Sequence, residues 1–378
     1  MSAPLRHAVG SLLVVGLGGT ELSAMERAWL RIVRPGGVIL FQRNVADAAQ
    51  TRALLDEATG LASPHAARCV DVEGGAVNRL RTALAPLPSA QAVACAMRTL
   101  RKPALAHTHG ELVARAVRAF GFNTTLAPVL DLGLPESAAA LGTRTAGATP
   151  DEIIADARGF LAGLAAHGVT GCGKHFPGLG GGVADSHVAT PSIARTLRQL
   201  TETDLAPYRA LVSALPMVMV NHAAYPRTAG GATPASVSRF WITTMLRKQL
   251  GYRGLVFSDD FEMGGILNHL PLEDAVLEAV RAGMDLIEIC KSPELVLRAY
   301  EALLCEAERS SAFALLIAQR AREVARKRAK LYAAPAARPL TDKQLAALRT
   351  RIEQFNAQVA KAVPHEPSAR TATRAEAS

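Results

Sequence analysis

The chain has 378 residues, of which 49% are hydrophobic, and carries a formal net charge of +9. A chain of this size and composition buries a large core in one or two domains, which excludes a disordered or fibrous protein. Its five cysteines include no CxxC pair, so they indicate neither a disulfide scaffold nor a zinc site, and they fit a reducing compartment best.

The first apolar run, 11–15, follows Arg6 and His7, an order that an export signal would also show. The run is short and leads into the glycine-rich segment 16–19 rather than into a small-residue cleavage pattern. We therefore interpret it as a core strand. No stretch of the sequence approaches the ~20 apolar residues that cross a bilayer, and we expect a cytoplasmic protein with no membrane partner.

Apolar, β-branched runs alternate with helical patterns along the chain, which is typical of parallel βα units. Thr149 and Pro150 are placed to begin a helix over 151–167, and Gly251 is placed to end one over 238–250. Eight such units favour an α/β fold, a single-domain (β/α)8 TIM-like barrel over residues 1–332. The expected strands are 11–15, 38–41, 68–72, 125–127, 169–173, 217–220, 255–257 and 285–289.

Reactive residues follow five of these expected strands. In a (β/α)8 barrel the chemistry lies at the carboxyl ends of the strands, so side chains that follow strands should meet at one rim. The residues in this position are Arg43, Asn44, Asp71, Glu73, Lys174, His175, Asn221, His222, Asp259 and Asp260. Charges scattered at random along helices and loops would not collect in this way.

The end of the chain differs in composition from the rest. Six basic residues lie between 320 and 330 without interleaved aromatic residues, which favours a solvated helix face over a nucleic-acid site. From residue 333 the chain is rich in Ala, Pro and Arg, and Thr341 is placed to cap one further helix to about Val359. We predict a tail over 333–378 with one helix, fraying beyond Pro364 and without chemistry.

Two other motifs are weaker candidates for binding sites. The segment 16–21 has a glutamate where a dinucleotide fingerprint needs its third glycine. His107 and His109 could chelate a metal ion, but no third ligand is evident nearby. We interpret the two histidines as an exposed pair at the start of a helix.

Asp259 has the strongest case for catalysis. A carboxylate that closes an apolar strand lies at the barrel mouth or is buried unpaired, and the second alternative is costly. A helix-capping role is the alternative, and Asp260 suits that role better. We therefore predict a catalytic Asp259.

The segment that includes Asp185 and His187 offers a proton donor. His187 follows Asp185 by two residues in a glycine-rich loop, so the carboxylate could orient the imidazole toward a substrate. A packing or surface role for His187 is the alternative. Lys174 and His175 would hold substrate hydroxyls or an anionic group, or else form a salt bridge that stabilises the barrel.

Taken together, these motifs resemble glycoside hydrolase family 3, and in particular its single-domain bacterial β-N-acetylglucosaminidases of peptidoglycan recycling. The similarity covers most of the chain in a fixed order of motifs. The matching segments are 37–44, 71–80, 126–131, 174–178, 185–187, 221–222, 246–251 and 258–260.

The resemblance implies a retaining exo-β-N-acetylglucosaminidase that removes terminal N-acetylglucosamine from N-acetylglucosaminyl-anhydro-muropeptides. It implies Asp259 as the nucleophile, His187 as the acid/base on a mobile loop, and Asp185 as the residue that orients His187. The sugar-binding residues that it implies are Asp71, Arg79, Arg144, Lys174 and His175. No metal or organic cofactor and no nucleic-acid partner is implied, and we expect a monomer acting on a small-molecule substrate.

Three positions depart from the family pattern. Leu179 stands where the loop usually has a second histidine, Val72 replaces a glutamine, and Thr145-Ala146 replaces Ser-Phe after Arg144. These departures concern loop closure and substrate fit rather than the proposed catalytic groups. Two alternatives stay open: a catalytically impaired barrel that binds muropeptides as a sensor, and phosphorolysis, because a neutral imidazole does not repel phosphate as a carboxylate would.

Overall fold

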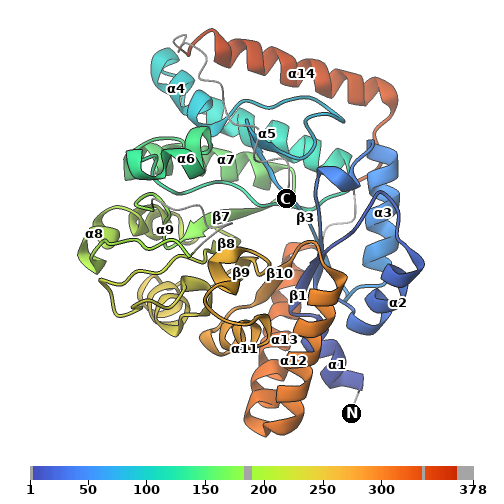
Figure 1. Ribbon diagram of the computed structural model, residues 1–378. Coiled ribbons are helices and arrows are strands. Elements are labelled where there is room, and N and C mark those ends of the chain that lie inside the picture. Colours follow the sequence, from blue (N-terminus) through green and yellow to red (C-terminus); the bar gives the residue numbers. More distant parts are fainter. Residues whose placement is uncertain (1–2, 183–189, 334–336, 364–378) are drawn as a thin grey trace.

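The computed structural model describes residues 3–182, 190–333 and 337–363. Within these residues, eight parallel strands close into a barrel and follow one another around it in chain order (Figure 1). The strands are β1 (Leu13–Gly16), β2 (Gly37–Leu40), β3 (Ala67–Val70), β6 (Thr124–Thr125), β7 (Thr170–Phe176), β8 (Met217–Val220), β9 (Leu255–Asp260) and β10 (Leu286–Ile289). The predicted (β/α)8 barrel and its eight strands are confirmed.

Helices surround the barrel, and their ends follow the capping signals of the sequence. Thr149 accepts a hydrogen bond from the backbone N–H of Glu152 and begins α7 with Pro150 in its first turn, as predicted. The helices are α1 (Ala3–Gly10), α2 (Ala24–Val33), α3 (Ala48–Gly60), α4 (Ala90–Leu100), α5 (Ala104–Ala119), α6 (Ala138–Leu141), α7 (Pro150–Ala166), α8 (Leu197–Glu202), α9 (Leu205–Leu211), α10 (Gly264–Leu267), α11 (Leu272–Ala282), α12 (Pro293–Arg309), α13 (Ser311–Leu331) and α14 (Asp342–Ala360). No helix of the described residues is both long enough and apolar enough to cross a membrane.

The helix predicted over 238–250 is present but has a wider turn than expected. It forms η5 (Phe240–Gln249), a π-helix in which the N–H of the following Leu250 donates to the carbonyl of Met245, five residues earlier. Trp241 is fully buried on this helix and packs edge-on against Phe176 of β7. The helix therefore supports the strand that carries Lys174 and His175.

Two strands carry a β-bulge near their carboxyl ends. On β7, Phe176 lies three residues after Gly173, but their pairing partners on β8 are only two residues apart. On β9, Asp260 lies three residues after Phe257, but their partners on β10 are only two residues apart. A bulge leaves one residue out of the ladder and re-aims the side chains around it. The two bulges therefore redirect the side chains of 174–175 and of 258–259, the segments that the sequence marks as functional.

Side chains satisfy the backbone groups that these bulges remove from the ladder. On β7, the amide of Asn221 donates to the carbonyl of His175 at 2.9 Å. On β9, the hydroxyl of Ser258 accepts from the N–H of Glu288 at 2.9 Å. Because a buried, unpaired backbone group is costly, Asn221 and Ser258 stabilise the two irregular strand ends.

A short hairpin that the sequence did not predict follows β3. It pairs β4 (Val72–Gly74) with β5 (Val77–Asn78). Its turn needs glycine, because Gly74 and Gly75 have φ angles of 100° and 58°, and a Cβ on Gly74 would lie 2.1 Å from the carbonyl oxygen of Pro88. The hairpin brings Glu73 to the barrel mouth.

The basic run between 320 and 330 is not a fully solvated face, so that prediction was wrong in part. Arg320 and Lys327 of α13 reach the buried carboxylate of Asp285 at 3.2 and 2.9 Å, and Arg247 reaches it at 2.6 Å. Arg328 is buried and donates to a backbone carbonyl. These cations bind α13 to the barrel because Asp285 would otherwise be an unpaired buried charge.

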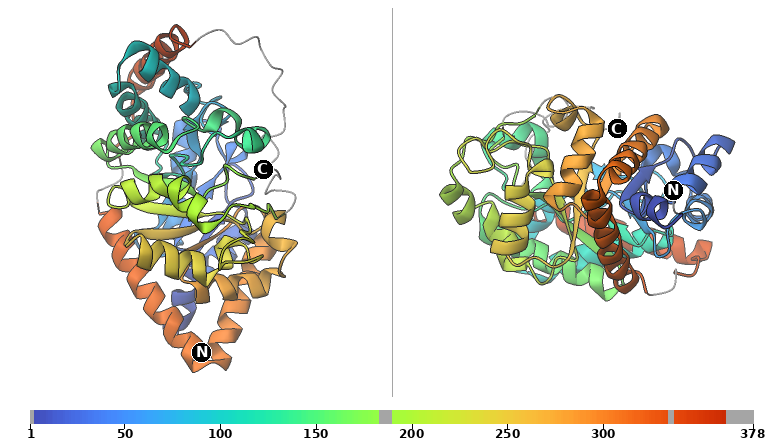
Figure 2. Two further views of the ribbon diagram at one scale, coloured as in Figure 1. Left: turned by 90° about the vertical axis from the view of Figure 1, so that its left-hand side faces the viewer. Right: turned by 90° about the horizontal axis from the view of Figure 1, so that it is seen from below.

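The helix predicted from Thr341 is confirmed as α14, which packs against α4 and α5 at the opposite end of the molecule from α12 and α13 (Figure 2). His109 of α5 lies beneath it, only 1% exposed, between Phe160 and Phe355. The prediction of an exposed His109 was therefore wrong. Burial lowers the pKa of His109 to about 4, so its ring is neutral.

Candidate active site

Two groups of side chains lie at the carboxyl ends of the barrel strands. We call the first the ion-paired cluster: Asp71, Glu73, Asp131, Arg144, Lys174 and His175. We call the second the carboxyl cluster: Asp259, Asp260, Glu288 and Cys290. Burial raises the pKa of the Glu288 carboxyl well above its usual value, and the charges of Asp260, Asp71 and Asp259 raise it further, so this carboxyl lies near members of both clusters.

The ion-paired cluster is centred on Lys174 of β7. Its ammonium lies 2.8 Å from a carboxylate oxygen of Asp71 and 2.7 Å from one of Glu73. Arg144 binds Glu73 with two parallel hydrogen bonds, at 2.9 Å from Nε and 2.8 Å from Nη2. Two cations thus offset two carboxylates, so the salt bridge that the sequence left as the alternative for Lys174 is present.

The charges of this cluster are held by one another. Burial alone would raise the pKa of Glu73, but Arg144 and Lys174 outweigh it and hold that pKa well below its usual range. Burial alone would lower the pKa of Lys174, but Asp71 and Glu73 raise it above its usual value. Glu73 and Lys174 therefore stay ionised at neutral pH, and the donors and acceptors of their ion pairs are fixed in place.

His175 lies in the same cluster with its ring fixed from both sides. Its Nδ1 lies 2.6 Å from Oδ2 of Asp131, and its Nε2 lies 3.3 Å from Nη2 of Arg144. Because a guanidinium only donates, Nε2 must accept and Nδ1 carries the proton. Asp131 also accepts from the N–H of Leu179 at 2.7 Å, so one carboxylate fixes the histidine and the start of the loop together.

Asp259 lies in the bulge at the end of β9 and is half-buried. The N–H of Asp260 donates to Oδ1 of Asp259 at 3.0 Å. The carbonyl of Asp260 lies 2.9 Å from Nε2 of His222, whose other ring nitrogen lies 2.7 Å from the hydroxyl of Ser236. These contacts fix the backbone on which Asp259 is mounted.

Asp260 does not have the role that the sequence suggested. Helix α10 begins after Met263, and Oδ1 of Asp260 instead accepts from the N–H of Glu262 at 3.0 Å. The helix-cap interpretation of Asp260 was therefore wrong. Burial raises the pKa of Asp260 to about 7, with smaller contributions from Glu262 and Asp259.

Four members of the two clusters were not among the predicted catalytic and sugar-binding residues. Glu73 and Asp131 lay inside the matched motifs, and their positions at strand ends were the signal for them. Glu288 and Cys290 were part of, or next to, an apolar strand. The signal for Glu288 was an acidic residue inside an apolar strand, because a buried acid needs a partner or a proton.

The structure brings together Asp71, Arg144, Lys174 and His175 of the predicted site residues. Arg79 lies nearby, with its N–H donating to the carbonyl of Asp71 at 3.0 Å. The guanidinium of Arg79 and that of Arg43 both lie over the ring of Phe41, at 5.5 and 4.7 Å from its centroid. Asp259 occupies the carboxyl cluster, while Asp185 and His187 lie outside the described residues.

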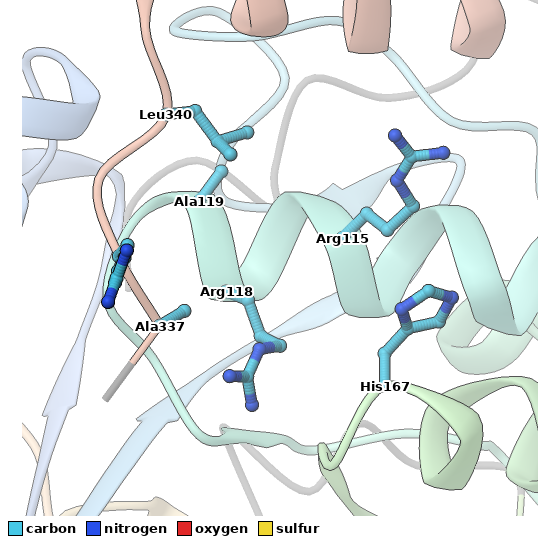
Figure 3. A pocket seen from close by; sticks show the side chains of 7 residues that line it. Arg115, Arg118, Ala119, His167, Ala337 and Leu340 are labelled. Carbon is cyan, nitrogen blue, oxygen red and sulfur yellow. The ribbon is translucent and has the colours of Figure 1, made fainter. Parts of the chain in front are cut away.

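A small cavity lies behind the ion-paired cluster. Its volume is about 10 Å³, and its lining includes Glu73, Arg144, His109 and Asp156. A larger cavity of about 160 Å³ lies elsewhere, where the segment 337–340 passes α5, and its lining includes Arg115, Arg118 and His167 (Figure 3). Neither cavity is lined by Asp259, and the described residues contain no group of three or more His, Cys, Asp or Glu arranged to hold a metal ion.

Comparison with known proteins gives one consistent result. Residues 4–326 match the N-terminal domain of glycosyl hydrolase family 3. The beta-hexosaminidase of Alkalilimnicola ehrlichii is 40% identical over 289 residues, which cover 75% of this chain and 82% of that protein. The beta-hexosaminidase of Idiomarina loihiensis is 35% identical over 300 residues, which cover 79% and 90%.

Solved structures agree with the sequence relatives. A glycoside hydrolase family 3 beta-N-acetylglucosaminidase from Paenibacillus sp. superposes with a TM-score of 0.83 at 29% identity, covering 94% of this chain and 69% of that one. NagZ from Neisseria gonorrhoeae, in complex with N-trifluoroacetyl-D-glucosamine, superposes with a TM-score of 0.74 at 28% identity, covering 93% and 97%.

Proposed function

The chain belongs to glycoside hydrolase family 3 and is a glycoside hydrolase, and from this premise we propose that it is a retaining exo-β-N-acetylglucosaminidase. We propose that it removes terminal N-acetylglucosamine from N-acetylglucosaminyl-1,6-anhydro-N-acetylmuramyl peptides during cell-wall recycling in the cytoplasm. The observation that carries the proposal is the pairing of an ordered cluster of ion-paired side chains, suited to sugar hydroxyls, with a carboxylate, Asp259, at the same barrel mouth.

The ion-paired cluster supplies the binding site in this proposal. Asp71 and Glu73 accept from sugar hydroxyls, while Lys174 and Arg144 donate to them. Because the four charges already fix one another, little side-chain entropy is lost when the sugar binds. His175 and Arg79 border the same site and complete the set of proposed binding residues.

The chemistry proceeds in two displacements at the anomeric carbon. Asp259 attacks this carbon, the glycosidic C–O bond breaks, and the leaving oxygen takes a proton from His187. In the second step His187 takes a proton from water, the resulting hydroxide attacks the anomeric carbon, and the bond to Asp259 breaks. Asp185 orients His187 in both steps, and the configuration of the sugar is retained.

The acetamido group in the proposed substrate rests on the relatives. The two curated relatives are beta-hexosaminidases, and the Neisseria protein was solved with an N-acylated glucosamine. A family 3 barrel alone does not distinguish glucose from N-acetylglucosamine, because function lies in the site rather than in the fold. The substrate must therefore be tested directly.

The test compares two chromogenic substrates, an aryl N-acetyl-β-glucosaminide and the plain aryl β-glucoside, with Asp259→Ala as the inactive control. We expect release of the chromophore from the first substrate at a kcat/KM at least about 100-fold higher than from the second. Faster turnover of the plain glucoside would refute the hexosaminidase proposal. Release of N-acetylglucosamine from an anhydro-muropeptide, followed by mass spectrometry in phosphate buffer, distinguishes hydrolysis from phosphorolysis.

A further inference from the structure

Strand β10 contains a glutamate among apolar residues, and the proposed mechanism does not use it. Glu288 lies between Ile287 and Ile289, and its side chain is only 3% exposed. The thiol of Cys290, two residues further along the strand, lies 3.2 Å from Oε1 of Glu288. Because side chains two residues apart share a face of a strand, Glu288 and Cys290 project to the same side.

The backbone of Glu288 brackets the bulge that carries Asp259. Its N–H donates to the hydroxyl of Ser258 at 2.9 Å, and its carbonyl accepts from the N–H of Phe261 at 2.9 Å. The thiol of Cys290 interacts with the carboxyl of Asp260 as well as with that of Glu288. One thiol thus joins the side chain of Glu288 to the residue after Asp259.

The groups that face Glu288 are mostly acidic or neutral. They come from β10 and three other strands. Lys174 of β7 is a cation, but it is already paired with Asp71 and Glu73. The titratable neighbours are Cys69 and Asp71 at β3, Cys172 of β7, Asp259 and Asp260 of β9, and Cys290 after β10. Arg43 approaches this end of the strand, where its charge interacts with that of Asp260 and its guanidinium donates to the backbone carbonyl of Cys290 at 2.6 Å.

Neither Asp260 nor Glu288 forms an ion pair with any residue in the part of the chain that the structure describes. Asp285, the residue just before β10, shows the contrast, because three cations surround its buried carboxylate. Two carboxylates that share one thiol and form no ion pair repel each other strongly when both are ionised. A proton on one of them removes that repulsion.

We propose that Glu288, Cys290 and Asp260 form a proton-holding carboxyl–thiol–carboxyl chain, in which Glu288 is a positioning residue for the bulge that presents Asp259. The chain retains at least one proton at neutral pH, so the repulsion between its carboxyls is absent while the enzyme works. Loss of this proton at alkaline pH separates the two carboxyls and displaces the bulge. The inference rests on the proposed role of Asp259 as nucleophile.

The first test is the pH dependence of kcat/KM for wild type and Glu288→Gln, measured with an activated aryl N-acetyl-β-glucosaminide. This substrate needs little protonation to depart, so the titration of His187 contributes little. We expect Glu288→Gln to keep activity at pH 7 within about threefold and to move the alkaline loss of activity upward by about one pH unit. Glu301→Gln, at an exposed position of α12, is the matched control and should follow wild type. Superimposable alkaline limbs for wild type and Glu288→Gln would overturn the proposal.

The second test needs no catalysis and separates this inference from the proposed function. Urea unfolding of wild type and Glu288→Gln is compared at pH 5 and pH 8. A buried acid that holds its proton makes the folded protein less stable as the pH rises above the pKa that this acid has in the unfolded chain. We therefore expect Glu288→Gln to have a higher urea midpoint of unfolding than wild type at pH 8 but not at pH 5. An equal difference at both pH values would show that Glu288 holds no proton. An enzyme that cleaves no N-acetyl-β-glucosaminide yet shows this pH-dependent gain would contradict only the function.

Discussion

The two clusters at the barrel mouth neutralise their charges in opposite ways. In the ion-paired cluster, Lys174 and Arg144 offset the carboxylates of Asp71 and Glu73, and the pKa of Glu73 is held far below its usual range. In the carboxyl cluster, burial raises the pKa of Asp260 to about 7 and the pKa of Glu288 well above its usual value. Cations neutralise the carboxylates of the ion-paired cluster, whereas bound protons neutralise carboxyls of the carboxyl cluster.

This difference suits the tasks that we propose for the two clusters. Paired ions keep fixed donors and acceptors at every physiological pH, which a binding site for hydroxyls needs. A nucleophile needs one ionised carboxylate and no further negative charge competing with it. Each cluster includes residues of a bulged strand end, so the same backbone irregularity presents both clusters. We expect the first site to depend little on pH and the second to depend on it strongly.

The sharpest test of the comparison removes the carboxylate that we propose as the nucleophile. Asp259→Ala should lower kcat by about 10⁴-fold or more, because the first chemical step loses its nucleophile. A fluorinated glycoside that traps the glycosyl-enzyme should label Asp259 in the wild type, as read by peptide mass spectrometry. A label on Glu73 or Glu262 would contradict the assignment and reverse the roles of the two clusters.

A second prediction concerns the proton that neither described cluster supplies. His187→Ala should slow substrates with poor leaving groups by about 10²–10⁴-fold and an activated aryl glycoside much less, because only the former need protonation to depart. Asp185→Ala should act in the same direction more mildly. Azide should partly restore turnover of the activated substrate by the His187 variant. Wild-type rates for both variants on both substrates would mean that another residue carries the proton.

A third prediction breaks the ion-paired cluster. Lys174→Met leaves the buried carboxylates of Asp71 and Glu73 with only Arg144, and removing one partner of a buried ion pair costs about 3–5 kcal/mol. We expect the unfolding free energy to fall by this amount in a denaturant titration and KM to rise. Lys343→Met, at an exposed position of α14, is the matched control. An unchanged unfolding midpoint would show that the pairs contribute no stability.

The last prediction concerns Asp260 and the dependence of stability on pH. Its pKa is about 7 in the folded chain and near the usual 3.8 when unfolded. Below about pH 4 both states are protonated, whereas between about pH 4 and 7 only the unfolded state loses its proton, so wild-type stability falls as the pH rises. Asp260→Asn should lack this part of the decline in denaturant titrations at a series of pH values, while the exposed Asp274→Asn should retain it. Parallel curves for Asp260→Asn and wild type would contradict the protonated state.

The barrel itself could be predicted because several of its strands, such as β1, β2 and β8, are continuous apolar runs. The prediction for β9 ended too early, at Phe257, because hydrophobicity marks where a strand is buried and not where it ends. Ser258, Asp259 and Asp260 continue the strand with polar side chains at the mouth. The bulge itself left no periodic signal, since it depends on the pairing with β10.

The candidate site could be predicted as a set of residues but not as a set of contacts. Strand ends brought Asp71 and Lys174 to one rim, as expected. The bidentate pair of Arg144 with Glu73 joins residues on segments with no shared periodicity, so only the fold could reveal it. Glu288 was missed because it was counted as part of an apolar strand. An acidic residue in such a strand is expected to be buried, and this unusual burial was the signal for it. The roles of Asp259, His187 and Asp185, the division of the chain at residue 332 and the monomeric state stay predictions.

Helix α14 matters for anyone who wishes to shorten the chain. It buries the apolar side chains of Leu348, Ile352 and Val359, and its Phe355 stacks on the neutral ring of His109 with centroids 6.1 Å apart. A chain trimmed at the end of the barrel would expose this ring and the apolar surface around it to water, and exposed apolar patches promote aggregation. Affinity tags and fusion partners therefore belong beyond residue 363 rather than at residue 332.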